Sequence, residues 1–149
     1  MRRYCTPPDA GIGYNAPDFL HFLESRMPDT TWFYENFEHT GSAIGFRITK
    51  KLDEVQSPFQ KIEIFESTDF GNVMTIDGAM MVTTRDNFFY HEMMSHAAIY
   101  THPNPKNIVI IGGGDCGTLH ECLKHADLKS VVQCDIDEQV TRMAEKYFP

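Results

Sequence analysis

The segment from Ile108 to Gly117 reads Ile-Val-Ile-Ile-Gly-Gly-Gly-Asp-Cys-Gly and decides the fold. Apolar residues that run directly into a glycine cluster predict a buried parallel strand that ends in a tight turn. The glycines at 112, 114 and 117 fit the spacing G-x-G-x-x-G, and a helical pattern follows them. A second apolar run, residues 131–134, ends on Asp135. This order of strand, loop, helix, strand and acid predicts a βαβ unit that binds a nucleoside, with the acid on the ribose hydroxyls.

Asp115 lies inside the glycine loop, where a dinucleotide would place its pyrophosphate. A carboxylate at this point repels phosphate, so the sequence favours an adenosine ligand that lacks phosphates and carries positive charge near the loop. Sulfonium nucleosides of the S-adenosylmethionine type have this chemistry. A second interpretation is that Asp115 caps the following helix. The two roles are compatible, because a carboxylate has a separate oxygen for each.

The composition excludes several classes of partner. The chain has 149 residues and a formal net charge of −8, which argues against nucleic acid and acidic membrane surfaces. No run approaches the roughly 18 apolar residues that a membrane-spanning helix needs. Paired cysteine spacings and a signal-like N-terminal segment are both absent from the sequence. These features predict reduced thiols in a cytoplasmic protein.

The periodicity changes along the chain and predicts three regions. Residues 1–30 are expected to form an irregular lead-in with one short helix. Residues 31–85 alternate with a period of two and contain Asp77-Gly78, a strong hairpin signal, so they predict a small antiparallel β-domain of about four to six strands. Residues 86–149 predict a helix followed by the first β-α-β-α of a parallel sheet.

Helix signals are clear in the last of these regions. Asp86 or Asn87 can cap a helix that runs to about Tyr100, and its stripe of Phe89, Met93 and Ala97, each four residues from the next, is expected to face a core. A helix should also follow the glycine loop. Asp137 can cap a last helix, whose apolar positions have helical spacing: Val140, Met143, Ala144 and Tyr147.

The fold class predicted is therefore α+β to α/β. A small N-terminal antiparallel β-domain is followed by the start of a Rossmann-like, methyltransferase-type parallel α/β domain. Two parallel strands cannot bury helices on both faces of their sheet, and such sheets normally contain several more strands. We therefore expect the chain to be a truncated form of a larger fold.

Taken together, residues 32–149 resemble the spermidine synthases, the polyamine aminopropyltransferases. Five segments carry the resemblance in order: QSPFQKIEIF (56–65), FGNVMTIDG (70–78), RDNFFYHEMM (85–94), HPNPKNIVIIGGGDCG (102–117) and VVQCDIDE (131–138). The chain departs from the family pattern at three of these positions. Asn87 and Asp135 stand where glutamate is commoner, and Cys116 stands where glycine is commoner.

The resemblance implies transfer of an aminopropyl group from decarboxylated S-adenosylmethionine to putrescine, which gives spermidine and methylthioadenosine. Decarboxylated S-adenosylmethionine would be a co-substrate, with no permanently bound cofactor. Matching positions imply that Gln60 contacts the nucleoside, Asp135 the ribose and Ile136 the adenine. The glycine loop would comprise Gly112, Gly113, Gly114 and Gly117.

Further roles follow from the same resemblance. Tyr90 and His91 would line the polyamine site, Asp115 would hold the aminopropyl amine, and Trp32 would close the diamine pocket. The general base of the family lies in an Asp-Ser-x-Asp-Pro-like loop that this sequence does not contain. We therefore expect the base beyond Pro149, and no activity from the chain alone. Family members associate through the β-domain, so a homodimer or higher homo-oligomer is expected.

Several alternatives stay open from the residues alone. Tyr90 and His91 could be an ordinary surface pair, and Gln60 a plain strand residue. Cys116 and His120 are spaced to share a metal, but no third ligand is spaced to join them, so no metal site is predicted. The chain could also be a methyltransferase-like relative, or a non-catalytic module for oligomerisation or nucleoside binding. A dinucleotide-dependent dehydrogenase is disfavoured by Asp115.

Overall fold

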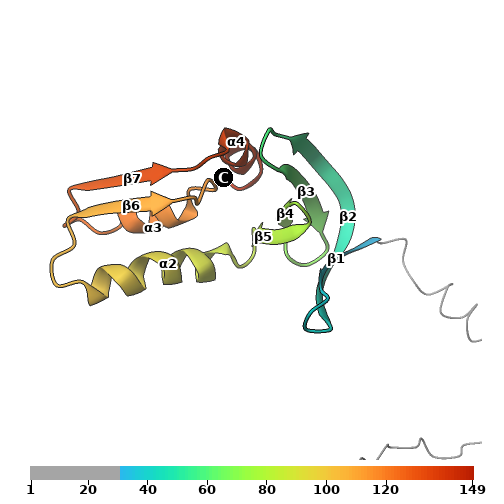
Figure 1. Ribbon diagram of the computed structural model, residues 1–149, viewed down its shortest axis with the longest axis horizontal. Helices are drawn as coiled ribbons and strands as arrows, with labels where there is room; N and C mark the ends of the chain where they lie inside the picture. Colours follow the sequence, from blue (N-terminus) through green and yellow to red (C-terminus); the bar gives the residue numbers. More distant parts are fainter. Residues whose placement is uncertain (1–30) are drawn as a thin grey trace, which may run out of the picture. The chain divides into compact units, whose positions relative to one another are not determined.

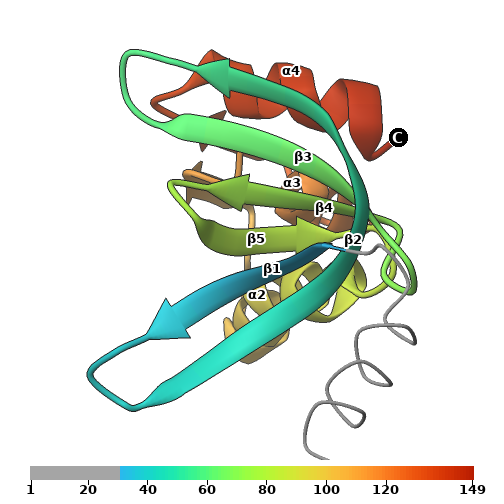
Figure 2. The ribbon, with the colours of Figure 1, turned by 90° about the vertical axis from the view of Figure 1, so that its right-hand side faces the viewer.

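Five antiparallel strands begin the part of the protein that the computed structural model describes, residues 31–149 (Figures 1 and 2). The helix predicted within residues 1–30 lies outside this range. The strands pair in sequence order, as predicted for an antiparallel β-domain. They are β1 (Thr31–Phe37), β2 (Ser42–Gln56), β3 (Lys61–Ser67), β4 (Asn72–Ile76) and β5 (Ala79–Thr83).

The hairpin predicted at Asp77-Gly78 is confirmed, and it joins β4 to β5. Asp77 and Gly78 have φ of 50° and 82°. Two consecutive residues with positive φ form the kind of two-residue turn whose twist matches that of the flanking strands. The Asp77 carboxylate also accepts a hydrogen bond from the Lys61 amide at 2.8 Å, which ties the turn to the start of β3.

Strand β2 spans 15 residues and crosses the sheet, as Figure 2 shows. Its first half pairs with β1 and its second half with β3. Register shifts between Ile48 and Lys50 and between Lys51 and Asp53 interrupt the pairing with β3. Such irregularities bend a strand and increase its twist. The bend allows one strand to serve two partners.

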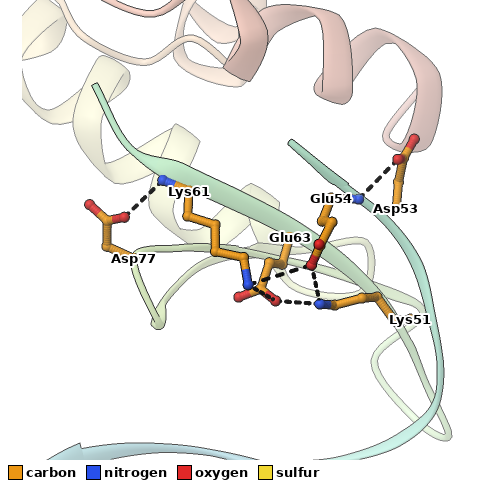
Figure 3. A network of polar contacts seen from close by, with 6 residues as sticks. All are labelled: Lys51, Asp53, Glu54, Lys61, Glu63 and Asp77. Atoms are coloured by element: carbon orange, nitrogen blue, oxygen red, sulfur yellow. Dashed lines mark hydrogen bonds and ion pairs between the residues drawn. The ribbon is translucent and has the colours of Figure 1, made fainter. Parts of the chain in front are cut away.

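Charged side chains from β2 and β3 form a network on one face of the sheet (Figure 3). Glu63 Oε1 lies 2.6 Å from Lys51 Nζ and 3.0 Å from Lys61 Nζ. Glu54 contacts both lysines as well. Exposed ion pairs of this kind add little stability individually. Side chains alternate along β3, so Lys61 and Glu63 lie on this charged face. Ile62 and Ile64 point to the opposite face and are fully buried.

The described core joins the β-domain to the last helix. Ile62 and Ile64 of β3, Met74 of β4 and Val82 of β5 form one buried cluster with three residues of α4 (Glu138–Tyr147): Val140, Met143 and Ala144. The α4 residues are those predicted from helical spacing. Lys146 Nζ and the Tyr147 hydroxyl both lie 2.8 Å from Asp53 Oδ2 at the edge of this contact. The β-domain and α4 therefore share a core within residues 31–149.

The rest of the chain forms the predicted β-α-β-α unit preceded by a helix. The elements are α2 (Asn87–Thr101), β6 (Asn107–Ile111), α3 (Gly117–Leu123), β7 (Ser130–Cys134) and α4. Strands β6 and β7 pair in parallel, with Ile108 opposite Val131. This arrangement confirms the predicted fold class. Of the helices described in residues 31–149, none is long and apolar enough to cross a membrane.

Two burial predictions were wrong. Strand β6 is not fully buried, since Val109 and Ile111 are 68% and 90% exposed. The reason is that the helix α3 and its neighbour α2 pack together on one side of the sheet. The apolar stripe of α2 at Phe89, Met93 and Ala97 is also exposed. A parallel stripe faces α3 in its place: His91, Ser95 and Ile99.

The start of α2 also differs in detail from the prediction. Asp86 occupies the N-cap position, but its side chain makes no cap hydrogen bond. Its carboxylate instead accepts a hydrogen bond from the Thr83 hydroxyl at the end of β5. This hydrogen bond links the end of β5 to the start of α2.

Candidate functional site

A cavity of about 860 Å³ lies where the β-domain meets the glycine loop. Its walls come from the turn before β3, from β4 and β5, the start of α2, the loop after β6, the end of β7 and the start of α4. We call it the loop pocket. The predicted site residues that line it are Gln60, Tyr90, Gly112, Gly113, Gly114, Asp115, Asp135 and Ile136, and its apolar wall includes Met74, Met80, Met81 and Val82. The structure thus brings most of the predicted site residues to one cavity.

The glycine loop requires its glycines for different reasons. Gly112 and Gly113 have φ of 81° and 70°, a region that side chains other than glycine occupy at a cost. Gly114 is buried, and a Cβ there would lie 2.9 Å from Asp135 Oδ2 and 3.0 Å from Val140 Cβ. The backbone of the loop therefore lies so close to Asp135 and to the first turn of α4 that only glycine fits at position 114.

Cys116 forms the N-cap of α3 with φ of 63°. This left-handed conformation favours glycine. The capping interpretation of Asp115 finds weak support, because the Gly117 amide lies 3.4 Å from Asp115 Oδ1, a long distance for such a bond. No side chain makes a recognised cap hydrogen bond at this helix start.

Asp115 has a closer partner in His91. The His91 Nε2 and Asp115 Oδ2 atoms lie 2.6 Å apart. His91 is only 6% exposed, and its ring packs against Gly117, where an added Cβ would overlap the imidazole. His91 therefore holds the Asp115 side chain through this contact, and it is not among the residues that line the loop pocket. Tyr90, one residue earlier, does line it.

Asp135 and Gln60 are connected through a residue that the sequence interpretation used only as a helix cap. Asp137 accepts hydrogen bonds from the Ser57 hydroxyl at 2.7 Å and from Gln60 Nε2 at 3.0 Å. Its amide donates to Asp135 Oδ1 at 2.9 Å. It also caps α4, as predicted, by accepting from the Gln139 amide at 3.0 Å. Asp137 thus links both nucleoside-site candidates.

Ser57 was missed by sequence reasoning, although a local signal was present. Its hydroxyl accepts hydrogen bonds from the amides of Phe59 and Gln60 at 3.1 and 3.0 Å. Serine commonly closes short turns in this way. The segment Ser57-Pro58-Phe59-Gln60 could therefore have been recognised as a serine turn, but its partner Asp137 could not.

The pKa of Asp137 has a testable consequence for stability. Burial raises this pKa, but the hydrogen bonds from Ser57, the Gln139 amide and Gln60 outweigh burial and lower the pKa below its usual value. A pKa lowered by folding stabilises the protein above the unfolded-state pKa of about 3.9. This contribution is lost as the pH falls through the lower folded-state pKa.

We therefore expect the stability difference between the unaltered chain and D137N to be constant from pH 7 to about pH 5 and to shrink below about pH 4. Urea unfolding at several pH values measures this difference directly. Taking the difference removes the contribution of the other carboxyl groups, which both proteins share. A difference that does not fall in acid would contradict the lowered pKa.

Trp32 lies apart from the residues that line the loop pocket. It is on β1, where its ring stacks on Tyr34 with centroids 5.9 Å apart, and the Arg47 guanidinium lies 5.2 Å from its ring centre. Its predicted role at a diamine pocket stays a prediction.

Ile136 lines the loop pocket and is largely exposed, as an apolar surface for a flat ring would be.

Within residues 31–149 no group of three or more histidine, cysteine, aspartate or glutamate side chains is arranged to hold a metal ion. Cys116 is engaged with Gln133, whose Nε2 lies 3.5 Å from the Cys116 sulfur.

Two protein-family models match this chain, one over the β-domain and one over the part that follows it. Residues 31–84 match the model of the spermidine synthase tetramerisation domain, and residues 87–149 match the model of the spermine/spermidine synthase domain. These matches meet at the junction between β5 and α2.

Individual relatives give the same result. A polyamine aminopropyltransferase of Xylella fastidiosa (strain M12) is 73% identical over 119 residues, which are 80% of this chain and 42% of that protein. One from Stenotrophomonas maltophilia (strain K279a) is 72% identical over 118 residues, which are 79% of this chain and 42% of that protein.

Solved structures are similar as well. A spermidine synthase from Thermotoga maritima superposes with a TM-score of 0.75 at 39% identity, covering 80% of this chain and 42% of that one. A spermidine synthase in complex with the transition-state analogue AdoDATO gives the same score and identity, over 80% of this chain and 41% of that one. The chain thus spans about two-fifths of the length of the relatives it matches. Two adjoining family domains, high identity and a shared fold agree, and the chain belongs to the spermidine synthase family.

Proposed function

We propose that this chain provides the nucleoside-binding part of an aminopropyltransferase. The reaction transfers the aminopropyl group of decarboxylated S-adenosylmethionine to putrescine and yields spermidine and methylthioadenosine. The observation that carries the proposal is the placement of Asp115 in the glycine loop, in the same pocket as Asp135 and Gln60. The complex of a related spermidine synthase with a transition-state analogue supports it.

Each pocket residue has a role that its chemistry supports. Asp135 accepts hydrogen bonds from the ribose hydroxyls, and Ile136 packs against the adenine. Gln60 contacts the nucleoside from the turn before β3. Asp115 pairs with the ammonium group of the aminopropyl chain, and His91 holds Asp115 in place through the 2.6 Å contact. Tyr90 and Trp32 are assigned to the polyamine side.

The reaction itself demands little covalent chemistry from the protein. A sulfonium is already a good leaving group, so the amine nitrogen of putrescine must be aligned with the carbon attached to sulfur and both must be desolvated. A new C–N bond forms as the C–S bond breaks, and the sulfur takes the electron pair. The attacking amine must also be deprotonated by a base.

The base is assigned to a group outside residues 31–149. The pocket carboxylates Asp115 and Asp135 already serve the substrate ammonium and the ribose in this proposal. A carboxylate that is paired with an ammonium is a poor proton acceptor, since the pairing favours its charged form. We therefore expect this chain to bind the nucleoside without catalysing turnover.

A homo-oligomer is part of the proposal. Residues 31–84 match a tetramerisation domain by sequence. Within the same residues, Trp32 and Tyr34 of β1 are large apolar side chains that are exposed on one face of the strand, which suits a surface covered by a second subunit. Sedimentation velocity measures this association directly.

A cytoplasmic location is also proposed. The three cysteines in the described part of the chain, Cys116, Cys122 and Cys134, are free thiols. Free thiols are typical of a reducing compartment.

Calorimetric titration of the chain with three ligands tests the proposed function. We expect decarboxylated S-adenosylmethionine and methylthioadenosine to bind. We expect no binding of NAD, because Asp115 would face its pyrophosphate. Binding of NAD alone would overturn the sulfonium assignment and favour a dinucleotide enzyme. Failure of all three to bind would overturn the nucleoside-site proposal for this chain.

A further inference from the structure

Ser57, Gln60 and Asp137 form a small polar cluster behind the loop pocket. The two ends of the cluster come from the turn between β2 and β3 and from the start of α4, about 80 residues apart in sequence. Asp137 is only 2% exposed, whereas Gln60 reaches the pocket wall. The cluster therefore connects a buried carboxylate to a side chain that a ligand can touch.

We infer that Asp137 is a positioning residue that dictates which end of the Gln60 amide faces the ligand. This inference rests on the proposed function, because it assigns Gln60 to nucleoside binding. The amide nitrogen of Gln60 points to Asp137, and the amide oxygen Oε1 is thereby presented to the pocket as an acceptor. The ligand group that it recognises is a hydrogen-bond donor of the nucleoside, a hydroxyl or an amino group.

The orientation follows from chemistry as well as from coordinates. An ionised carboxylate only accepts hydrogen bonds, and of the two ends of an amide only the nitrogen donates. The Ser57 hydroxyl, the Gln139 amide and Gln60 all surround Asp137 with donors, which favours its charged form. Turning the Gln60 amide over would place two acceptors about 3 Å apart in a buried site, and a buried unsatisfied pair of this kind is costly.

Asp137 also fixes the second acceptor of the pocket. Its backbone amide holds Asp135 Oδ1 at 2.9 Å, so Oδ2 remains for the ligand. Oδ2 lies close to the backbone of Gly114 in the loop, 2.9 Å from where a Cβ would be. One residue thus orients two acceptors of the pocket, one on Gln60 and one on Asp135. The side-chain contact can be changed by mutation while the backbone contact to Asp135 is retained.

The variant D137N separates orientation from folding. An asparagine oxygen can still accept from the Gln139 amide and cap α4, but its amide nitrogen would meet the nitrogen of Gln60. Gln60 is then expected to turn and present its nitrogen to the ligand in place of its oxygen. We expect the Kd of methylthioadenosine to rise about tenfold. Thermal unfolding of each variant checks that the fold is retained.

A compensating variant provides the decisive control. In Q60E/D137N the asparagine amide donates to one oxygen of the introduced glutamate, and the other oxygen again faces the ligand as an acceptor. The net charge equals that of the unaltered chain. We expect the Kd of methylthioadenosine to return to within about threefold of the starting value, whereas Q60E alone places two carboxylates together and weakens binding by about tenfold or more.

The outcomes separate the inference from the proposed function. Unchanged affinity in D137N, or a double variant as weak as D137N, would overturn the inference while leaving the nucleoside site intact. A measurement without ligand tests the orientation independently. In an NMR experiment on the unaltered chain, the resonance of the Gln60 side-chain amide should shift as Asp137 is protonated by added acid. A resonance that does not shift would also overturn the inference. Absence of any methylthioadenosine binding by the unaltered chain, with that NMR shift present, would overturn the proposed function alone.

Discussion

Replacing Gly117 by alanine is expected to destabilise the chain by about 3 kcal/mol, the upper part of the range for overpacked sites. Alanine ordinarily stabilises a helix by about 1 kcal/mol relative to glycine, so the expected sign is the reverse of the usual one. The cause is His91, whose ring occupies the space that a Cβ at position 117 would need. His91 is buried and held by Asp115, so it cannot move without separating α2 from α3.

Urea unfolding of four variants, G117A, H91A, H91A/G117A and G41A, tests this expectation. Gly117→Ala should show the large loss, while G117A introduced into H91A should make that variant more stable, because the ring is gone and only the helix propensity remains. Gly41→Ala measures backbone strain without a clash, since Gly41 has φ of 65° and open space around it, whereas Gly117 is not among the glycines with positive φ. That control should cost about 1 kcal/mol. Stabilisation by G117A in the presence of His91 would show that the two residues are not in contact.

Local features of the chain were predicted well because each has a short-range cause. The Asp77-Gly78 turn, the alternation of Ile62 and Ile64, and the strand that ends just before Gly112 all follow from residues within a few positions of one another. The cap of α4 by Asp137 is local too. Such features require no knowledge of what packs against them.

The burial of α2 could not be predicted in the same way. Two stripes of this helix have the same spacing of four residues, one apolar through Phe89 and Met93, the other polar through His91 and Ser95. Hydrophobicity favours the first, but the structure buries the second. Two contacts make this possible: His91 reaches Asp115 across the interface, and the Ser95 hydroxyl donates to the His91 carbonyl at 2.8 Å. Satisfied polar groups can be buried at little cost.

The same limit applies to the candidate site. Gly112, Asp115 and Asp135 were identified from one continuous motif, and the loop pocket contains them all. The pairs His91–Asp115 and Gln60–Asp137 lie 24 and 77 residues apart. A single sequence does not show which residues so far apart come into contact. The contacts that support the site therefore became visible only when the chain was folded.

Replacing Asp115 by asparagine is expected to weaken the binding of decarboxylated S-adenosylmethionine by about thirtyfold. A hydrogen bond to a charged group contributes about 1.5–3 kcal/mol, and the ammonium of this ligand would lose its counter-charge. Methylthioadenosine has no ammonium, so its Kd should change by less than about threefold. Ordinary S-adenosylmethionine should bind better to the variant, because its carboxylate no longer meets a like charge.

Calorimetric titration of the three ligands against D115N and a control variant, D135N, distinguishes charge pairing from loop structure. Asp135 is assigned to the ribose, which all three ligands share, so D135N should weaken all of them to a similar extent. Asparagine at position 115 retains an oxygen that can accept from His91, and the packing of His91 on Gly117 should survive. Equal losses for every ligand in D115N would show that Asp115 only maintains the loop. A loss confined to the ligand that carries an ammonium and lacks a carboxylate would establish Asp115 as the residue that selects the decarboxylated substrate.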